Sequence, residues 1–272
     1  MDDSLLTALL SLVFPLRCLL CAESVEGEST KTQALCRLCH SLIDERLRIG
    51  RVAGINFFTY GSYGIEFAEI VLAAKEENSA AARRYLAKVL SLSLIAGLAH
   101  QPTHASETGR EAVSKIILIP MPSPRKSERV RGYNHCLLLA REVARQSTAH
   151  CPGVAIETRS LLRLARATVD QTGLDAQARA ANLSQAFRVV HPGGWGLLRG
   201  WGSWGSWGRW GNKAPKRPVD PSVELSRSIV VLVDDVMTTG STVREAVRAL
   251  QAAGCEPKMA ILACVSPRLF YE

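Results

Sequence analysis

The chain has 272 residues, a length that suffices for one substantial hydrophobic core and a small appended module. Its 47% hydrophobic and 21% charged residues are ordinary for a soluble globular protein, and no run of about eighteen apolar residues predicts a membrane span. The net charge of +8 indicates anionic ligands, either phosphates or nucleic acid, and says nothing of the fold.

The N-terminal segment raises the question of a secretion signal, because residues 5–14 are apolar. Asp2 and Asp3 argue against one, since the start of a signal peptide is basic, and no cleavage site of small residues follows. We therefore expect a helix or strand that packs on the core, in a cytoplasmic protein.

Two C-x-x-C pairs follow, Cys18 with Cys21 and Cys36 with Cys39. Each pair can place two thiolates on one tight turn, and two such turns supply the four ligands of a tetrahedral structural zinc site. The separation of the pairs is slightly shorter than usual. Disulfides are the alternative, which a reducing cytoplasm disfavours. We expect zinc on these four cysteines.

The next elements are one strand and two helices. Aromatic and small residues over 57–64 predict a strand and a turn, and apolar residues at helical spacing predict helices over 65–75 and 80–98. Lys75 ends the first helix, where a solvated lysine near the helix dipole is the common case. A loop is expected over 101–109.

A buried strand is predicted over 115–119, where it meets the proline-rich residues 120–124. A basic loop over 125–134 and a helix over about 135–146 follow. Four cations after a strand end are positioned to close over a pyrophosphate, which arginine side chains bind well. A solvated basic loop is the simpler interpretation of this segment by itself. Cys136 and Cys264 lie in apolar surroundings and are expected to be inert core thiols.

Residues 191–221 hold all five tryptophans, alternating with glycine and serine and followed by cations. Such a segment forms no packed core by itself, so we expect a disordered insertion. Its aromatic rings could stack on unpaired bases of single-stranded nucleic acid. A low-complexity expansion is the alternative that we favour.

The most informative stretch is 228–253. An aliphatic run predicts a strand buried on both faces that stops at Asp234 and Asp235, followed by a loop of small hydroxyl residues and a helix over 243–253. N–H groups at a helix N-terminus favour an anion, and carboxylates at a strand end can accept from the hydroxyls of a sugar. The stretch predicts a site for a ligand with a phosphate and a diol. Helix capping by Asp and Thr is the alternative.

Residues 230–242 resemble the phosphoribosyl-pyrophosphate (PRPP) signature of type I phosphoribosyltransferases: four apolar residues, two acids, two variable positions and Thr-x-Gly-x-Thr. The resemblance implies that Asp234 and Asp235 contact the ribose hydroxyls. It also implies that the 5'-phosphate is held by Met237, Thr238, Thr239, Gly240, Ser241 and Thr242.

The order of all these parts is similar to that of the ComF family, phosphoribosyltransferase-like proteins associated with bacterial competence. The likeness rests on Phe-Pro at 14–15, the two cysteine pairs, Lys75, Pro-Met-Pro at 120–122, Arg-Gly-Tyr-Asn at 131–134 and the PRPP motif. It extends to residues 162–171, to Arg-x-x-Asn at 179–182 and to Ala-Phe at 186–187. His135 departs from the family pattern, which has Gln there.

The resemblance implies an α/β fold of the type I phosphoribosyltransferase kind, a mainly parallel sheet flanked by helices, with a small N-terminal zinc-binding module. We expect the zinc module in residues 1–50, a helical connector or hood in 51–110 and the phosphoribosyltransferase-like domain in 111–272. In the implied reaction, PRPP with Mg²⁺ transfers its phosphoribosyl group to a base. Asp234 and Asp235 hold the sugar, and the leaving pyrophosphate is stabilised by Arg125, Lys126, Arg129 and Arg131.

The competing interpretation is a non-enzymatic competence factor that binds PRPP or single-stranded DNA and assists DNA-uptake proteins in natural transformation. A PRPP-sensing regulator is a third. No side chain in the sequence indicates an acceptor base.

Overall fold

The computed structural model describes residues 17–25, 35–101, 115–165, 185–190, 225 and 228–270. Four expectations therefore lie outside the described residues: the apolar N-terminal segment, most of the loop after residue 101, the family-like residues over 166–182 and the tryptophan-rich insertion. The side chain of Arg125 also lies outside them.

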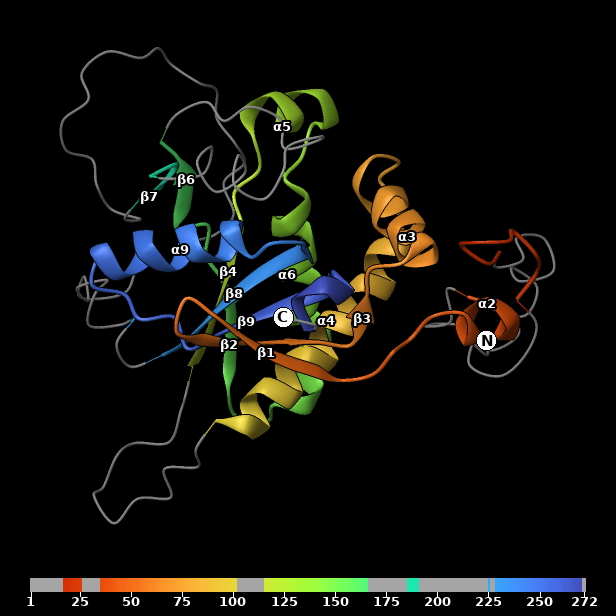
Figure 1. Cartoon of the computed structure of the whole chain (residues 1–272), viewed down its shortest axis with the longest axis horizontal. Helices are drawn as coiled ribbons and strands as arrows, with labels where there is room; N and C mark the ends of the chain where they lie inside the picture. The colour runs from red at the N-terminus through yellow and green to blue at the C-terminus, as the bar shows by residue number, and fades with distance from the viewer. Residues whose placement is uncertain are drawn as a thin grey trace, which may run out of the picture.

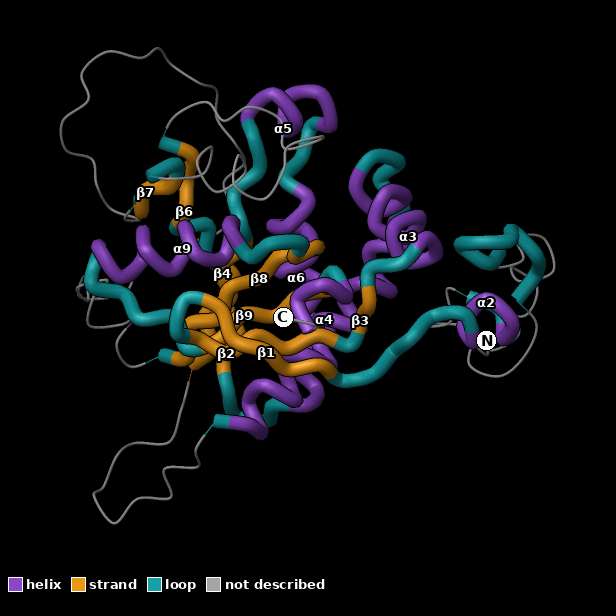
Figure 2. Tube along the Cα trace, in the orientation of Figure 1, coloured by secondary structure: helices purple, strands orange, loops and turns teal. Residues whose placement is uncertain are grey.

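A seven-stranded sheet forms the centre of the molecule (Figures 1 and 2). Six strands follow the order β1-β2-β9-β8-β4-β5. The short strand β3 pairs with the last two residues of β9, after the part of β9 that pairs with β2. Within this sheet β1 and β2 are antiparallel, and the other pairs are parallel. The strands are β1 (Arg48–Val52), β2 (Ile55–Thr59), β3 (Gly61–Ser62), β4 (Lys115–Pro120), β5 (Ala155–Thr158), β8 (Ile229–Met237) and β9 (Met259–Val265).

Helices cover both faces of the sheet. One face packs against α3 (Ile65–Lys75), α4 (Ala80–His100) and α6 (His135–Ser147). The other packs against α9 (Ser241–Ala252) and a small antiparallel pair, β6 (Leu162–Leu164) with β7 (Phe187–Val189). Shorter helices are α2 (Arg37–Ser41), α5 (Arg125–Arg131), η1 (Thr148–His150) and η2 (Pro267–Phe270). None of the described helices combines the length and apolar character that a membrane span requires.

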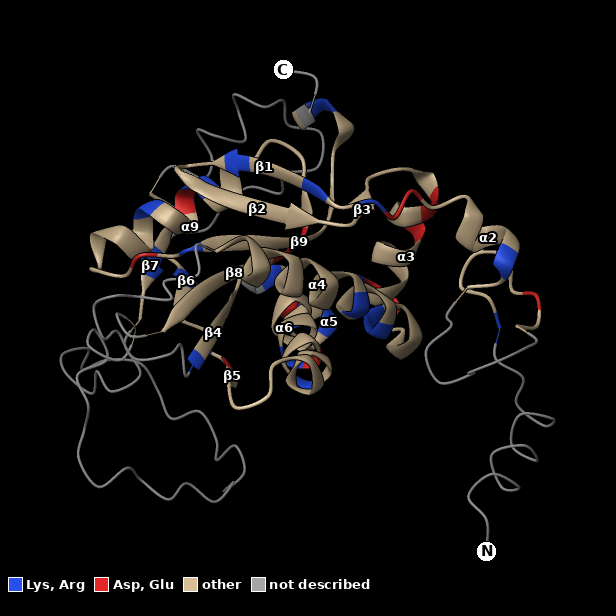
Figure 3. Cartoon of the chain, turned by 90° about the horizontal axis from the view of Figure 1, so that it is seen from below, with Lys and Arg blue, Asp and Glu red and all other residues tan. Residues whose placement is uncertain are grey.

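Successive residues of the central strands serve opposite cores, because side chains alternate across a strand. In β8, Val231 and Val233 join the core under α4, whereas Val230 and Leu232 join the core under α9. Strands β2 and β9 carry no charged residue, and many of the charged positions lie on the helices (Figure 3). The predicted α/β class, with a mainly parallel sheet flanked by helices, is confirmed.

Two local expectations differ from the structure. β8 does not stop at Asp234 but runs on to Met237, because its pairing with β9 continues through Val236 and Cys264. Residues 125–131 form helix α5 instead of a loop; it begins after Pro124 and ends at Gly132, which adopts a positive φ of 79°. Within the expected connector or hood of residues 51–110, β2 pairs with β9 and α4 packs on the sheet.

The backbone passes close to itself where β3 meets β9. A Cβ at Gly61 would overlap the carbonyl oxygen of Ala263 and the ring of Phe67. We expect Gly61→Ala to destabilise the fold by about 1–3 kcal/mol, the usual cost of overpacking a core. Gly64→Ala is the matched control, because a Cβ there meets nothing closer than 3.5 Å. Thermal unfolding compares the two variants, and equal midpoints would contradict the expectation.

Candidate functional site

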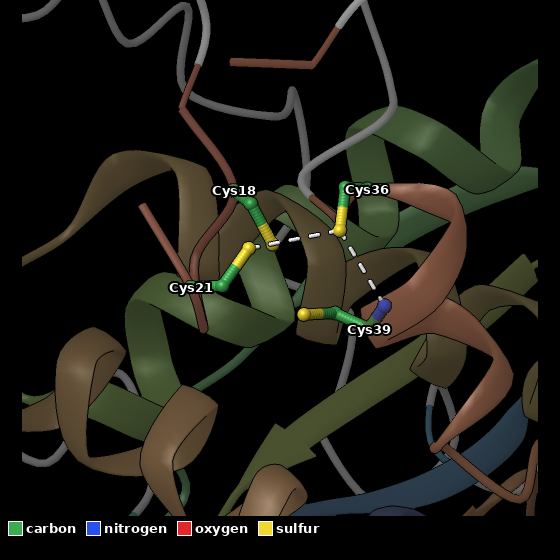
Figure 4. A group of neighbouring side chains, drawn as sticks. All are labelled: Cys18, Cys21, Cys36 and Cys39. Atoms are coloured by element: carbon green, nitrogen blue, oxygen red, sulfur yellow. Dashed lines mark hydrogen bonds between the residues drawn. The ribbon is translucent and has the colours of Figure 1, made fainter. Parts of the chain in front are cut away.

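The four cysteines of the two C-x-x-C pairs come together, as Figure 4 shows. Their sulfur atoms all lie within 4.8 Å of one another. The first pair sits on a turn closed by a hydrogen bond of 3.0 Å from the Ala22 N–H to the Cys18 carbonyl. In the second pair Cys36 caps α2, and its sulfur accepts from the Cys39 N–H at 3.4 Å. All eight cysteines of the chain are described and free of disulfides.

The electrostatics of the cluster fit a metal ion. Burial opposes ionisation of Cys18, but N–H groups of Cys21, Cys36 and Leu20 outweigh it and lower the pKa of the thiol to about 6. Burial and the neighbouring sulfurs raise the pKa of Cys39. One thiolate therefore forms readily, and a cation between the sulfur atoms would favour ionisation of Cys39 as well. The four cysteines could hold a metal ion, for which zinc is the common choice.

A second cluster lies at the carboxyl end of β8. Asp234 and Asp235 are 7% and 8% exposed. Asp234 Oδ1 accepts from the Asp235 N–H at 3.0 Å and lies 3.6 Å from Cys136 Sγ. Asp235 Oδ1 accepts from the Val236 N–H at 2.7 Å. Each carboxylate thus has one oxygen fixed by the backbone, which orients the pair.

Two helices bring further side chains to Asp235. Lys75, at the end of α3, places Nζ 3.8 Å from Asp235 Oδ2. His135, at the start of α6, places Nε2 3.6 Å from the same oxygen. The sequence did not place Lys75 here, because a lysine at a helix end is most often solvated; its place in the family pattern was the available signal. α6 begins at this point because Asn134 caps it, its side chain accepting from the Leu137 N–H at 2.8 Å.

The two carboxyl groups differ in charge. Burial and the charge of Asp235 raise the pKa of Asp234 well above its usual range. Burial opposes ionisation of Asp235 too, but Lys75 and His135 outweigh it, so the pKa of Asp235 is lowered. The two shifts run in opposite directions, so Asp235 ionises before Asp234, which keeps its proton to higher pH. Asp235 is therefore the better acceptor of hydrogen bonds, and Asp234 the better donor.

Cys136 Sγ, Asp234 and Asp235 offer three donor atoms within 4.8 Å of one another. The ammonium group of Lys75 already lies beside Asp235, so we assign no metal to them. Burial raises the pKa of Cys136 well above its usual range, and that of Cys264 likewise. Both stay neutral thiols, in keeping with their expected place in the core.

The loop after β8 forms a small polar pocket at the N-terminus of α9. Gly240 has a φ of 72°, and a Cβ there would lie 2.9 Å from Val52 Cγ2, so the turn requires glycine. Gly240 has no side chain to cap α9, and of the first turn the Ser241 N–H donates to Thr239 Oγ1 at 3.5 Å. The pocket is lined by Asp234, Val236, Met237, Thr238, Thr239, Gly240, Ser241 and Thr242. The pocket thus joins Asp234 of the acidic pair to every residue of the predicted phosphate loop.

Arg244 is a residue near this loop that the sequence reading missed. It lies one turn into α9, is exposed, and its guanidinium donates to the Thr239 carbonyl. Its position four residues after Gly240 was the available signal, because such residues share a face of a helix.

The basic segment is placed differently from expectation. Arg131 pairs with Glu76, at 3.3 Å, and donates to the Ser127 carbonyl at 3.2 Å. Its side chain is 6% exposed, so it is an anchor of α5 against α3 in this structure and does not contact the acidic pair. Tyr133 reinforces the anchor by donating to the Lys75 carbonyl at 2.9 Å. Lys126 and Arg129 are exposed on α5.

Glu245 ties α9 to the hairpin of β6 and β7. It is 5% exposed, accepts from the Phe187 N–H at 2.9 Å and pairs with Arg248 at 2.7 Å. Burial opposes its ionisation, but Arg248 and the Phe187 N–H outweigh burial and lower the pKa of Glu245. The ionised carboxylate therefore stabilises the fold above the ordinary pKa of a glutamate, and this stability is lost as pH falls through the lowered pKa.

We expect Glu245→Gln to cost about 1–3 kcal/mol of stability at pH 7, because a buried hydrogen-bonded charge is lost and Arg248 is left unpaired. The deficit should shrink as pH falls below about 4, where the wild-type carboxylate is protonated too. Denaturant unfolding at several pH values measures it. Glu69→Gln, at an exposed position of α3, is the control. A deficit that does not change with pH would contradict the role of the charge.

A family model described as a phosphoribosyl transferase domain matches residues 212–268, which include β8, α9 and β9. A search of curated proteins finds no match. The matched segment holds the acidic pair and the whole pocket loop. Residues 212–268 therefore match a phosphoribosyl transferase domain, within a mainly parallel α/β sheet flanked by helices, and the chain also carries a four-cysteine cluster near zinc-binding geometry.

Proposed function

We propose that this protein binds PRPP with Mg²⁺ and transfers the phosphoribosyl group to a base, releasing pyrophosphate. The observation that carries the proposal is the continuity of the site: Asp234 belongs both to the acidic pair and to the lining of the phosphate pocket. A ligand with a phosphate and vicinal hydroxyls would therefore engage both halves at once.

Each half has a distinct task. The N–H groups at the start of α9, with the hydroxyls of the loop, hold the 5'-phosphate, because donors and the helix dipole favour an anion there. Asp235 accepts from one ribose hydroxyl, and the protonated Asp234 donates to a neighbouring oxygen. Fixing the sugar at both ends orients its anomeric carbon, which lowers the entropic part of the barrier.

In the reaction the bond between the anomeric carbon and the pyrophosphate oxygen breaks, and its electron pair leaves with pyrophosphate. A nitrogen lone pair of the base forms the new bond, and a base that carried a proton there releases it to solvent. Lys126 and Arg129 are exposed on α5 and free to turn toward the leaving group. Arg125 and Arg131 complete the proposed basic set, Arg131 after release from Glu76. Bound Mg²⁺ supplies charge neutralisation for the pyrophosphate oxygens.

We also propose that the four-cysteine cluster holds a structural zinc ion. The set of four thiols fits zinc, because such sites are closed by four soft ligands and leave no place for substrate. The absence of disulfides among the eight cysteines supports a reducing compartment, and we propose the cytoplasm.

Isothermal titration of the full chain with PRPP and Mg²⁺ tests the binding step. A pyrophosphate-release assay with a panel of bases then tests the transfer. We expect saturable PRPP binding and turnover with at least one base. No binding of PRPP would contradict the proposal. Binding without turnover would favour the non-enzymatic alternatives, a competence factor or a PRPP-sensing regulator, and single-stranded DNA affinity would then separate these two.

A further inference from the structure

His135 is a buried polar residue that lacks hydrogen-bond partners in the described part of the chain. Its side chain is 1% exposed, and neither ring nitrogen has a hydrogen-bond partner in the described chain. Leaving such a group unsatisfied away from water costs free energy, so a partner is expected in the working state of the protein. Nε2 is the nitrogen directed at the site, 3.6 Å from Asp235 Oδ2.

The distance between His135 Nε2 and Asp235 Oδ2 limits which group can bind to both. At 3.6 Å the imidazole and the carboxylate are too far apart for a direct hydrogen bond, yet one oxygen atom can lie within about 2.7–3.0 Å of both. Such an oxygen must donate to the carboxylate and accept from the imidazole. A hydroxyl group or a water molecule does both, whereas a carbonyl or phosphate oxygen only accepts, so among ligand groups a hydroxyl fits.

The charges around His135 limit the charge that this binding group can carry. His135 is faced by Asp235 from β8, by Lys75 from α3, by Arg131 from α5 and by Arg83 from α4. Asp234 accepts from the Asp235 N–H and lies 3.6 Å from Cys136 Sγ. Burial is the main cause that lowers the pKa of His135; Asp235 opposes it, and the three cations add to it. The Lys75 ammonium repels a cation and Asp235 repels an anion, which leaves a neutral hydroxyl as the fitting group.

We propose that His135 is a specificity-determining residue that recognises the same ligand hydroxyl as Asp235. The hydroxyl donates to Asp235 Oδ2 and accepts from the N–H of His135 Nε2. This inference rests on the proposed function, since the hydroxyl belongs to the ribose of PRPP. A glutamine side chain could donate from a similar place, which gives the experiment a conservative variant.

The test compares ligands with and without hydroxyl groups. Isothermal titration is run on wild type, His135→Leu and His135→Gln with PRPP, ribose 5-phosphate, pyrophosphate and inorganic phosphate. We expect His135→Leu to weaken binding of the two sugar ligands about tenfold, because one hydrogen bond and the partner of a buried group are lost. Its affinities for pyrophosphate and phosphate should stay within about twofold, and His135→Gln should recover most of the loss.

Ser147→Ala is the matched control. Ser147 ends the same helix, is fully buried, and its hydroxyl also has no hydrogen-bond partner in the described chain. Removing it should leave all four affinities unchanged. Equal losses for all ligands in His135→Leu would show a structural effect and overturn the inference. Unchanged PRPP affinity would overturn it too, with the proposed function intact. If wild type binds no PRPP, both fail together.

Discussion

Cys39→Ser is expected to abolish zinc binding at the four-cysteine cluster, the largest single effect that the structure predicts. Structural zinc sites bind with about 10–16 kcal/mol, and that free energy depends on a closed set of four ligands. Serine keeps the size of the side chain but offers no soft thiolate. The wild-type chain should carry one zinc ion per molecule by elemental analysis, and the variant less than about a tenth of that.

The loss of zinc binding should also destabilise parts of the fold outside the four cysteines. Cys18, Leu35 and Cys39 belong to the same core cluster as buried residues of α3 and α4, and Tyr85 of α4 donates to Glu45. We therefore expect the variant to unfold at a lower temperature than wild type. A chelator should lower the wild-type midpoint toward that of the variant and leave the variant unchanged, because ligand release removes the binding contribution to stability.

Cys151→Ser is the control for this prediction. Cys151 is partly exposed and lies outside the cluster. It should retain one zinc ion and the wild-type response to chelator. Retention of a full zinc complement by Cys39→Ser would contradict the four-ligand site. A metal-free wild-type protein that unfolds at the same temperature with and without added zinc would contradict the zinc proposal itself.

Local patterns made much of this fold predictable. The sequence predicts β4 and β8 from their aliphatic runs, and α3 from the helical spacing over 65–75. A strand buried on both faces is apolar throughout, whereas a helix buried on one face has apolar residues at helical spacing. The two C-x-x-C pairs were equally direct, since the spacing itself fixes the turn that each pair forms. α3 begins and ends where the spacing predicted.

What escaped prediction depends on partners distant in sequence. β8 continues past the acidic pair because β9 offers further pairing, which no property of residues 236–237 signals. Arg131 pairs with Glu76, 55 residues earlier, a contact that no local pattern signals. The approach of Lys75 and His135 to one oxygen of Asp235 required the ends of α3 and α6 to meet at β8. The sequence therefore located the site more completely than it assigned roles to the charged side chains around it.

Asp235→Asn and Asp234→Asn are expected to differ sharply in PRPP affinity, although the two residues are neighbours. Asp235 is the ionised member, so the amide removes the charge and turns a donor or a weaker acceptor toward the ligand hydroxyl. We expect affinity to fall about 100-fold, the upper range for a hydrogen bond to a charged group. Asp234 is the protonated member, whose amide retains both a donor and an acceptor, so a loss within about fivefold is expected.

The folded state should survive both changes. Lys75 loses its partner in Asp235→Asn, but its side chain is 38% exposed and can be solvated. Thermal unfolding and the affinity for inorganic phosphate serve as controls, because the pocket loop keeps its backbone donors in both variants. Equal losses of PRPP affinity would show that the two carboxyl groups share the charge. A larger loss for Asp234→Asn would reverse the assignment of acid and carboxylate, and the sugar would then be oriented by the carboxylate nearer the phosphate pocket.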